Sequence, residues 1–411
     1  MGRPLDEERR RRAHREPMWR YFHHHQHLEL DKLLLGSVSV PVTRAPATPA
    51  PSPEAPVAEA AEQLAADLAA GAQERRRSEQ HRVHVFDPAA IAEARARLGP
   101  PPSKTDGKRD TTALARSVAA LDRAAQDDGW RSVPWTGPDA IVEPFADFGP
   151  AYENFRPVID HLQVQWMLAT RSISAAEARL DPILLVGPPG IGKTRFASLI
   201  AERLGVRISV FSAGGAQDAM QLCGSDARWS NTRTGMVFDA LAGGDSAAPV
   251  LVVDELDKLA PESGSNRDTP INTLLDLLEP DSARRYMDMS LQLDMDASKV
   301  IVIATANERE RISSPLLSRL TEFHITPPTA EQRRAIAETY FGQLCETHEC
   351  RDDLALDVPS LEAAAETTDF DVRELLRMVR TGFARAVVEG SDRVTLAPTR
   401  RGPARRRIGF V

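Results

Sequence analysis

Residues 183–203 read ILLVGPPGIGKTRFASLIAER, and this stretch decides the fold. A short apolar run is followed by a glycine-rich segment, Gly187–Thr194, and then by residues typical of a helix. The glycine-rich segment fits GxxxxGK(S/T), the pattern of a phosphate-binding loop between a strand and a helix. Glycine lets the backbone turn several N–H groups toward one anion. The stretch therefore predicts a strand, a nucleotide-binding loop and a helix in direct succession.

The residues of this loop have expected roles in holding a nucleotide. Lys193 supplies a positive charge to the β- and γ-phosphates, and the Thr194 hydroxyl is suited to Mg²⁺. The start of the following helix adds the positive end of its dipole. We therefore predict ATP and Mg²⁺ as cofactors. The expected nucleotide-binding residues are Gly187, Pro188, Pro189, Gly190, Ile191, Gly192, Lys193 and Thr194.

Three further apolar runs share the character of the first. They cover Arg207–Phe211, Val250–Val253 and Val300–Thr305, and helix-like stretches separate them. Continuous apolar strands that alternate with helices are typical of a parallel sheet covered on both faces. Upstream, apolar residues from Phe155 to Ala169 recur every three or four positions, which predicts one more helix. The predicted fold class is α/β, a P-loop NTPase with a parallel sheet flanked by helices.

Acidic and amide side chains follow two of these strands. Asp254 and Glu255 come directly after Val250–Val253, and Asn307 comes two residues after Thr305. The carboxyl ends of parallel strands meet at one edge of a sheet, so these side chains would lie beside the phosphate loop. Asp254 would hold Mg²⁺, and Glu255 would activate the attacking water as a general base. Asn307 would hold that water or sense the γ-phosphate, although an asparagine at this place, taken alone, more often caps the next turn.

Arg319 follows a short segment that begins with proline, in SSPLLSRL (313–320). A surface arginine is usually only solvated. Phosphoryl transfer, however, gains greatly from an arginine that a neighbouring subunit presents to the phosphates. The expected catalytic residues are therefore Lys193, Glu255, Asn307 and Arg319.

Four motifs carry a family resemblance: GPPGIGKT, VLVVDELDK, VIVIATAN and SSPLLSRL. In this order and at these intervals they resemble an AAA+ ATPase, and most of all the ATPase module of Lon proteases. The resemblance covers about residues 150–390 and includes the more specific segments 274–307 and 223–235. It implies a nucleotide-binding α/β subdomain over 150–326 and a small helical lid subdomain over 327–398.

The resemblance also implies roles for arginines outside the loop. Phe370–Arg373 resembles the second-sensor motif of the lid, which makes Arg373 a nucleotide-binding residue, with Arg377 and Arg380 as competing candidates. Arg319 would be the arginine finger and Asn307 the first sensor. Because such a finger acts on the nucleotide of the adjacent subunit, the resemblance implies a homo-oligomer, a hexameric ring.

In such rings an aromatic loop lines the central pore and grips unfolded polypeptide. The matching residue is Trp229 in GSDARWSNTRTG (224–235), which would bury apolar surface of an extended chain, or would instead pack in the core. Ser230 and Asn231 stand where the family pattern has an aliphatic residue and glycine. Tyr286 is the expected substrate contact of a second pore loop.

The ends of the chain differ in composition from its body. Residues 1–20 carry seven Arg and four acidic residues, and residues 399–411 carry five Arg and none, so the net charge of −8 divides into +3, +5 and −16. A Pro/Ala-rich stretch at 41–56 cannot bury apolar surface. We expect a disordered basic and Pro-rich leader over 1–55, a loosely structured helical region with a thin alanine core over 56–140, and a basic tail over 399–411.

Several classes of protein are excluded. Three Cys in 411 residues do not make a disulfide scaffold, and no stretch approaches the roughly 18 apolar residues of a membrane span. We therefore expect a cytoplasmic protein that does not contact membranes. The resemblance to Lon ends near residue 390, and neither Ser nor Lys follows residue 391, so we expect no peptidase site in this chain.

The main functional hypothesis is an ATP-hydrolysing, ring-forming remodeller or unfoldase that acts on unfolded or misassembled protein. The first alternative is an AAA+ nucleic-acid motor or loader that uses the basic ends of the chain. The second is a scaffold in which ATP orders an interface without turnover.

Overall fold

The computed structural model describes residues 81–98, 111–137, 141, 143–172, 174–175, 177–215, 219–226, 232–259, 269–348, 354–367 and 371–397. All of them belong to one compact unit, Leu68–Val411. The predicted leader over 1–55 and tail over 399–411 lie outside the described residues. Within the described part of the chain, no helix combines the length and apolar character needed to cross a membrane.

A parallel sheet of five strands, in the order β4-β5-β8-β3-β9, forms the centre of the fold. Each of the four predicted apolar runs is a strand, with bounds within one residue of the prediction. The fifth strand, β9, escaped sequence reasoning because its TEFH sequence is neither continuous nor alternating in apolar character. The strands are β3 (Ile183–Val186), β4 (Ile208–Ser212), β5 (Val250–Asp254), β8 (Ile301–Ala306) and β9 (Thr321–His324).

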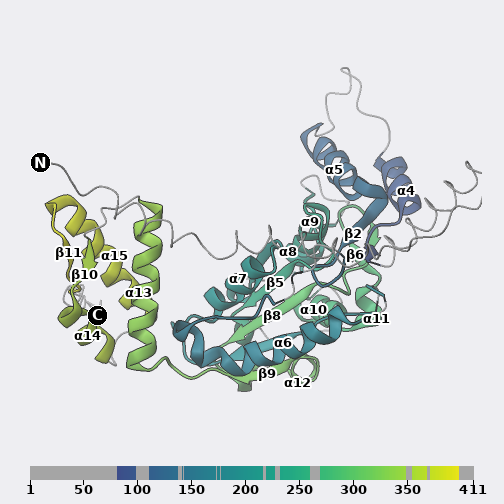
Figure 1. Ribbon diagram of the computed structural model, residues 1–411. Coiled ribbons are helices and arrows are strands. Elements are labelled where there is room, and N and C mark those ends of the chain that lie inside the picture. The colour runs from purple at the N-terminus through teal and green to yellow at the C-terminus, as the bar shows by residue number, and fades with distance from the viewer. Residues whose placement is uncertain are drawn as a thin grey trace, which may run out of the picture. The chain divides into compact units, whose positions relative to one another are not determined.

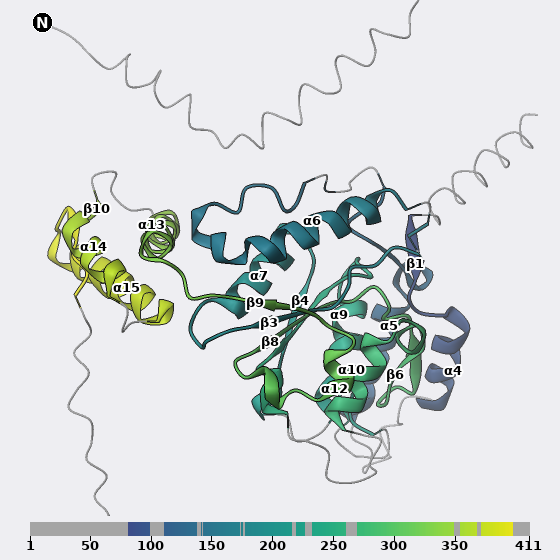
Figure 2. The same cartoon turned by 90° about the horizontal axis from the view of Figure 1, so that it is seen from below.

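Helices cover both faces of this sheet, as predicted. Figure 2 shows α6 (Arg156–Thr170) and α7 (Lys193–Arg203) on one side, and α10 (Pro270–Leu278) and α12 (Ser314–Leu317) on the other. A right-handed crossover places successive helices on opposite faces when the chain reverses its direction across the sheet. The prediction of an α/β fold with a parallel sheet flanked by helices is confirmed.

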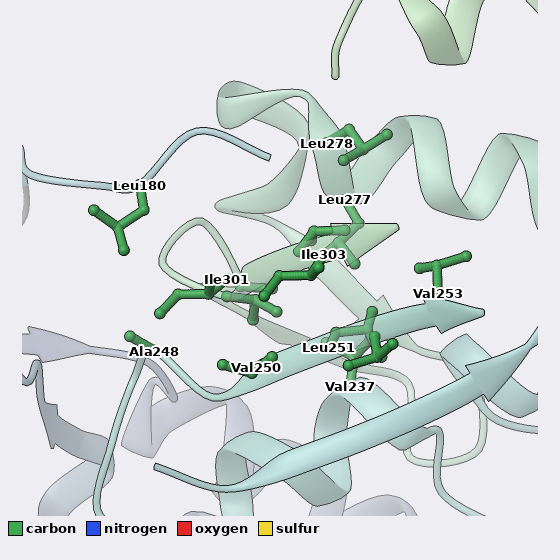
Figure 3. Packing of buried hydrophobic residues seen from close by; sticks show 14 of the residues in the cluster. Leu180, Val237, Ala248, Val250, Leu251, Val253, Leu277, Leu278, Ile301 and Ile303 are labelled. Carbon is green, nitrogen blue, oxygen red and sulfur yellow. The ribbon is translucent and has the colours of Figure 1, made fainter. Parts of the chain in front are cut away.

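The core between sheet and helices is continuous and apolar. Both faces of β5 and β8 are buried, which is why these strands read as unbroken apolar runs. Figure 3 shows residues of β5 and β8 in one cluster with residues of α10 and the neighbouring helix α9 (Met236–Ala242). The labelled members from these elements are Val237, Val250, Leu251, Val253, Leu277, Leu278, Ile301 and Ile303.

Shorter elements connect the strands and helices. A two-stranded antiparallel hairpin, β6–β7, lies between α11 and β8. The remaining connecting elements are α8 (Met220–Cys223), α11 (Pro280–Ala283), β6 (Tyr286–Asp288), β7 (Leu293–Met295) and the 3-10 turns η2 (Pro150–Phe155), η3 (Ala213–Gly215), η4 (Leu256–Lys258) and η5 (Arg309–Arg311).

Residues 81–137 pack into the same core, so the expectation of a thin alanine core is wrong for this part. Phe86, Leu121 and Trp135 are each at most 1% exposed and join the main hydrophobic cluster. Arg131 is 2% exposed, lies over the Phe86 ring, and donates to carbonyls that include that of Leu241. The elements are β1 (Arg82–His84), α4 (Pro88–Leu98), α5 (Thr111–Ala124), η1 (Gln126–Gly129) and β2 (Trp130–Ser132).

Three helices after β9 form a second hydrophobic cluster of their own. Figure 1 shows them together with a short parallel pair of strands, β10 and β11, at the edge of the group. Leu361, Leu375, Val379 and Phe383 are buried between them. The elements are α13 (Ala330–Thr347), β10 (Ala355–Leu356), α14 (Val358–Glu366), α15 (Val372–Glu389) and β11 (Arg393–Val394).

Candidate nucleotide-binding site

The carboxyl ends of adjacent strands bring most of the predicted residues together. The Gly187 N–H donates to the Ala306 carbonyl at 3.1 Å, so the glycine-rich loop after β3 begins beside Asn307 at the end of β8. A cavity of about 350 Å³ opens at this edge. The predicted residues in its lining are Pro189, Gly190, Ile191, Gly192, Lys193, Thr194, Asp254, Glu255, Asn307 and Arg373.

Lys193 is buried at the base of the loop, with 7% of its surface exposed. Its ammonium donates to the Gly187 carbonyl at 2.7 Å, to the Pro188 carbonyl at 2.9 Å and to Asn307 Oδ1 at 3.0 Å. Burial lowers the pKa of Lys193 below its ordinary value, against the attraction of Asp254. The ammonium has three donors, and all three are used in these bonds. A bound phosphate would therefore have to replace one or more of these acceptors as a partner of Lys193.

The backbone of the loop fits a phosphate group. Gly190 and Gly192 have φ angles of 83° and 97°, in the left-handed region that side chains disfavour. Lys193 is the first residue of α7, so the loop leads directly into the N-terminal end of this helix. Loop N–H groups and a helix N-terminus together favour bound anions.

A carboxylate and two hydroxyls meet on one side of the cavity. Asp254 Oδ1 accepts from Thr194 Oγ1 at 2.8 Å and from Thr305 Oγ1 at 2.6 Å. The Glu255 N–H donates to Thr305 Oγ1 at 3.1 Å. Carboxylate and hydroxyl oxygens are the ligands that Mg²⁺ prefers, so Thr194 and Asp254 fit this ion. Sequence reasoning missed Thr305, although a lone hydroxyl inside an otherwise apolar strand was the available signal.

Glu255 follows β5 in an unusual backbone conformation. Its φ of 57° is in the left-handed region, and such conformations in non-glycine residues cluster at functional sites. A Cβ atom on Gly214 would lie 2.9 Å from Glu255 Oε2, so the small residue at position 214 leaves room for the carboxylate. The side chain is exposed and lines the cavity. It can therefore reach a solvent molecule there.

Asn307 is held from two sides. Its backbone N–H donates to Asp257 Oδ1 at 3.2 Å, while its side-chain oxygen faces Lys193. Asp257 is 3% exposed, and its Oδ2 atom has no hydrogen-bond partner among the described residues. Asp257 was not predicted, although its position two residues after Glu255 places it in the same turn. It positions the Asn307 backbone against the loop.

Helices α13 and α15, which follow β9, contribute one wall of the cavity. Arg373, in the first turn of α15, is part of the lining, whereas Arg377 pairs with Glu374 at 2.5 Å. Of the three arginines proposed for the second sensor, Arg373 is therefore the one at the cavity. The wall also offers apolar surface for a nucleoside, from Tyr152, Phe155, Ile336, Tyr340, Val372 and Leu376.

Arg319 lies outside this lining. Its guanidinium donates to the Pro315 carbonyl at 3.0 Å and pairs with Glu279 at 3.2 Å, with 35% of the side chain exposed. In this chain it does not reach the cavity that Lys193 and Glu255 share.

The two predicted pore residues have different outcomes. Trp229 lies outside the described residues. Two hydrogen bonds hold the described residues on either side of it. The Ser225 N–H donates to the Arg233 carbonyl at 3.0 Å, and the Gly235 N–H donates to Asp288 Oδ2 at 2.7 Å.

The substrate-contact prediction for Tyr286 is wrong. Tyr286 is 4% exposed, and burial raises the pKa of its hydroxyl well above the ordinary value. The physical reason is the strand periodicity of β6, which turns Tyr286 into the core and leaves the next residue, Met287, 44% exposed.

Comparison with protein families matches the segment that carries the glycine-rich loop and the strand ends of this cavity. Residues 183–327 match the model of the ATPase family associated with various cellular activities (AAA). We call this matched segment the AAA domain. The match begins at β3 and ends just after β9, so the AAA domain contains the sheet, the phosphate loop, Asp254, Glu255, Asn307 and Arg319.

Similarity to Lon proteases, which the motifs suggested, is also confirmed. The chain is 33% identical over 217 residues to a Lon protease of Malacoplasma penetrans, covering 52% of this chain and 27% of that protein. It is 31% identical over 252 residues to Lon protease 2 of Thermus thermophilus, covering 58% of this chain and 31% of that protein. The chain thus spans about a third or less of these relatives.

A solved structure with a similar fold is the Holliday junction branch migration motor RuvB of Thermotoga maritima. Its TM-score is 0.39 at 18% identity, over 58% of this chain and 65% of that one.

Proposed function

We propose that the AAA domain binds ATP with Mg²⁺ and hydrolyses it in the cavity described above. The observation that carries this proposal is the convergence of Lys193, Asp254, Glu255 and Asn307 on one cavity, beside a glycine loop that opens a helix. AAA domains as a family use such a site for nucleotides. The apolar wall from η2, α13 and α15 is suited to the uncharged part of the ligand.

The residues would divide the chemistry among them. Loop N–H groups and Lys193 would take the phosphates, and Thr194 and Asp254 would hold Mg²⁺, which supplies charge neutralisation between the β- and γ-phosphates. Glu255 would orient the attacking water and accept its proton. Asn307, released from Lys193 by the phosphates, would hold that water from the opposite side.

We further propose that the protein works as a ring of identical subunits, a hexamer by its resemblance to Lon, that remodels or unfolds protein. Arg319 supports this, because it lies outside the cavity of its own chain on an exposed edge. An arginine presented to the neighbour's nucleotide accelerates phosphoryl transfer by about 10³-fold or more. Arg319 would thus couple hydrolysis to assembly. Trp229 remains the proposed contact with an extended polypeptide.

The test is the steady-state ATPase rate, with and without Mg²⁺, in wild-type protein and in Glu255→Gln. We expect Glu255→Gln to retain ATP affinity and to lose turnover by about 10²- to 10⁴-fold, because an amide cannot accept the proton. Ordinary turnover in this variant would remove Glu255 as the base. Binding without turnover in the wild-type protein would instead support the scaffold alternative.

The same assay distinguishes the substrate classes. We expect an unfolded polypeptide to stimulate the wild-type ATPase, and light scattering to detect a larger oligomer with ATP than without it. Stimulation by DNA or RNA, lost as salt is raised, would favour the nucleic-acid motor.

A further inference from the structure

The first turn of α15 rests directly on the phosphate loop. The Val372 N–H donates to the Gly190 carbonyl at 3.2 Å. A Cβ atom on Gly190 would lie 2.6 Å from both Cβ and Oδ2 of Asp371, so the Asp371 side chain covers this glycine from the lid side. A carboxylate therefore lies against a loop whose expected ligand is a polyphosphate.

The charge of Asp371 exceeds what its structural role needs. Asp371 is the N-cap of α15, and its Oδ1 atom accepts from the Glu374 N–H at 2.8 Å. Asparagine and serine cap helices about as well as aspartate, because capping requires only an acceptor oxygen. A neutral N-cap would therefore still hold α15, losing only the modest attraction between the carboxylate and the helix dipole, and would place no negative charge beside the loop.

The same turn carries a group of the opposite sign. Arg373 lines the cavity two residues after Asp371. Bound phosphate would attract Arg373 and repel Asp371. Because both residues belong to the first turn of α15, the two forces would act on the same turn. Asp371 is exposed, so water weakens its repulsion of a bound phosphate, but like charges a few ångströms apart still repel measurably at a protein surface.

We propose that Asp371 sets the nucleotide affinity of this site: its carboxylate opposes bound phosphate, so that nucleotide binding competes with the contact between α15 and Gly190. This inference rests on the proposed nucleotide site and adds a determinant of affinity to it. The position of α15 then depends on the charge of the ligand through Asp371, although Asp371 itself does not bind the ligand.

The experiment compares ligands of different charge by titration calorimetry. In Asp371→Asn we expect about tenfold tighter ATP binding, a smaller gain for ADP, and no change for adenosine, which carries no phosphate. Serine also caps helices, so Asp371→Ser should show the same changes in affinity as Asp371→Asn. Asp371→Glu keeps the negative charge and should keep the weaker wild-type affinity for ATP. Thermal melting checks that each variant is folded.

Asp357→Asn is the matched control. Asp357 caps α14 in the same way, accepting from the Ser360 N–H at 3.1 Å, but it is Asp371, and not Asp357, that a Cβ atom on Gly190 would meet. Its affinity for all three ligands should equal that of the wild type. No ATP binding by wild-type protein would refute the nucleotide site itself. Wild-type ATP affinity in both Asp371→Asn and Asp371→Ser, or an equal gain for adenosine, would overturn only the role of Asp371.

Discussion

The two ends of the central sheet use buried polar groups in opposite ways. At the carboxyl ends, Lys193 donates to Asn307 and Asp254 accepts from Thr194, and all four residues line an open cavity. At the amino ends, residues 81–137 close the sheet with backbone hydrogen bonds, from the Ser132 N–H to Asp245 before β5 and from Asp296 before β8 to Val85. Arg131 is buried at this closed end.

The difference lies in what can replace each partner. One of the acceptors of Lys193 is the side chain of Asn307, and a ligand in the cavity can take the place of this side chain. Arg131 donates to carbonyls at both α5 and α9, including those of Arg123 and Leu241 at 2.9 and 3.2 Å, and these residues lie outside the lining of the cavity around Lys193. The polar groups at the carboxyl ends can therefore change hydrogen-bond partners, whereas those at the amino ends stabilise the fold.

The largest effect should follow from Lys193→Ala. Removing the buried ammonium leaves the loop without its charge for the phosphates, so we expect no ATP binding up to millimolar concentration, measured with a fluorescent analogue. The free energy of unfolding should change less than in Arg131→Met, because water in the open cavity can donate to the acceptors that Lys193 leaves. Lys258→Ala, at an exposed lysine outside the cavity lining, is the control and should bind normally. Tight ATP binding by Lys193→Ala would break the assignment of this end.

Arg319→Ala should separate binding from turnover. We expect wild-type ATP affinity, because Arg319 lies outside the cavity, together with a loss of about 10³-fold in turnover. Mixing Arg319→Ala with Lys193→Ala subunits should restore part of the ATPase activity, since each variant supplies what the other lacks. Absence of rescue would count against an arginine that acts on the neighbouring subunit.

At the closed end, Arg131→Met should affect stability alone. The change leaves buried carbonyls without donors, and we expect a loss of about 3 kcal/mol in the free energy of unfolding by urea. Nucleotide affinity of the folded protein should stay the same. Arg95→Met is the control, because Arg95 and Asp122 form an exposed pair that contributes about 1 kcal/mol or less. Equal losses in the two variants would contradict the comparison.

The smallest effect should be a pH dependence from Lys299, which lies 3% exposed in the turn before β8. Burial lowers its pKa from 10.5 to about 8. Between these values the unfolded chain binds a proton that the folded chain has released, so stability from this group rises with pH. Relative to Lys299→Met, the wild-type protein should gain stability from pH 8 to pH 10, measured by urea unfolding.

Lys299→Arg provides the reference for this titration. Arginine stays charged over the whole range, so its stability relative to Lys299→Met should not rise in the same way. A flat difference between wild type and Lys299→Met would show that Lys299 does not titrate in this window.

Much of the open end could be predicted from the sequence. The GxxxxGKT pattern, the apolar run ahead of Asp254 and that ahead of Asn307 are local signals, and parallel strands place their carboxyl ends at one edge. Asp257 and Thr305 were missed because their roles depend on hydrogen bonds between separate strands. Tyr286 was expected in a pore loop, whereas it lies in β6, where the register of the strand buries it.

The amino-acid sequence alone was enough to predict the type of fold, the glycine-rich loop and the acidic and amide residues that follow the strands. These features show in hydrophobic periodicity and in residue types that stand close together in the chain. The packing of residues 81–137 against the amino ends of the sheet, and of Asp371 over Gly190, became visible only in the folded chain. Both are contacts between segments far apart in the chain, where burial and charge depend on neighbours that no local pattern encodes.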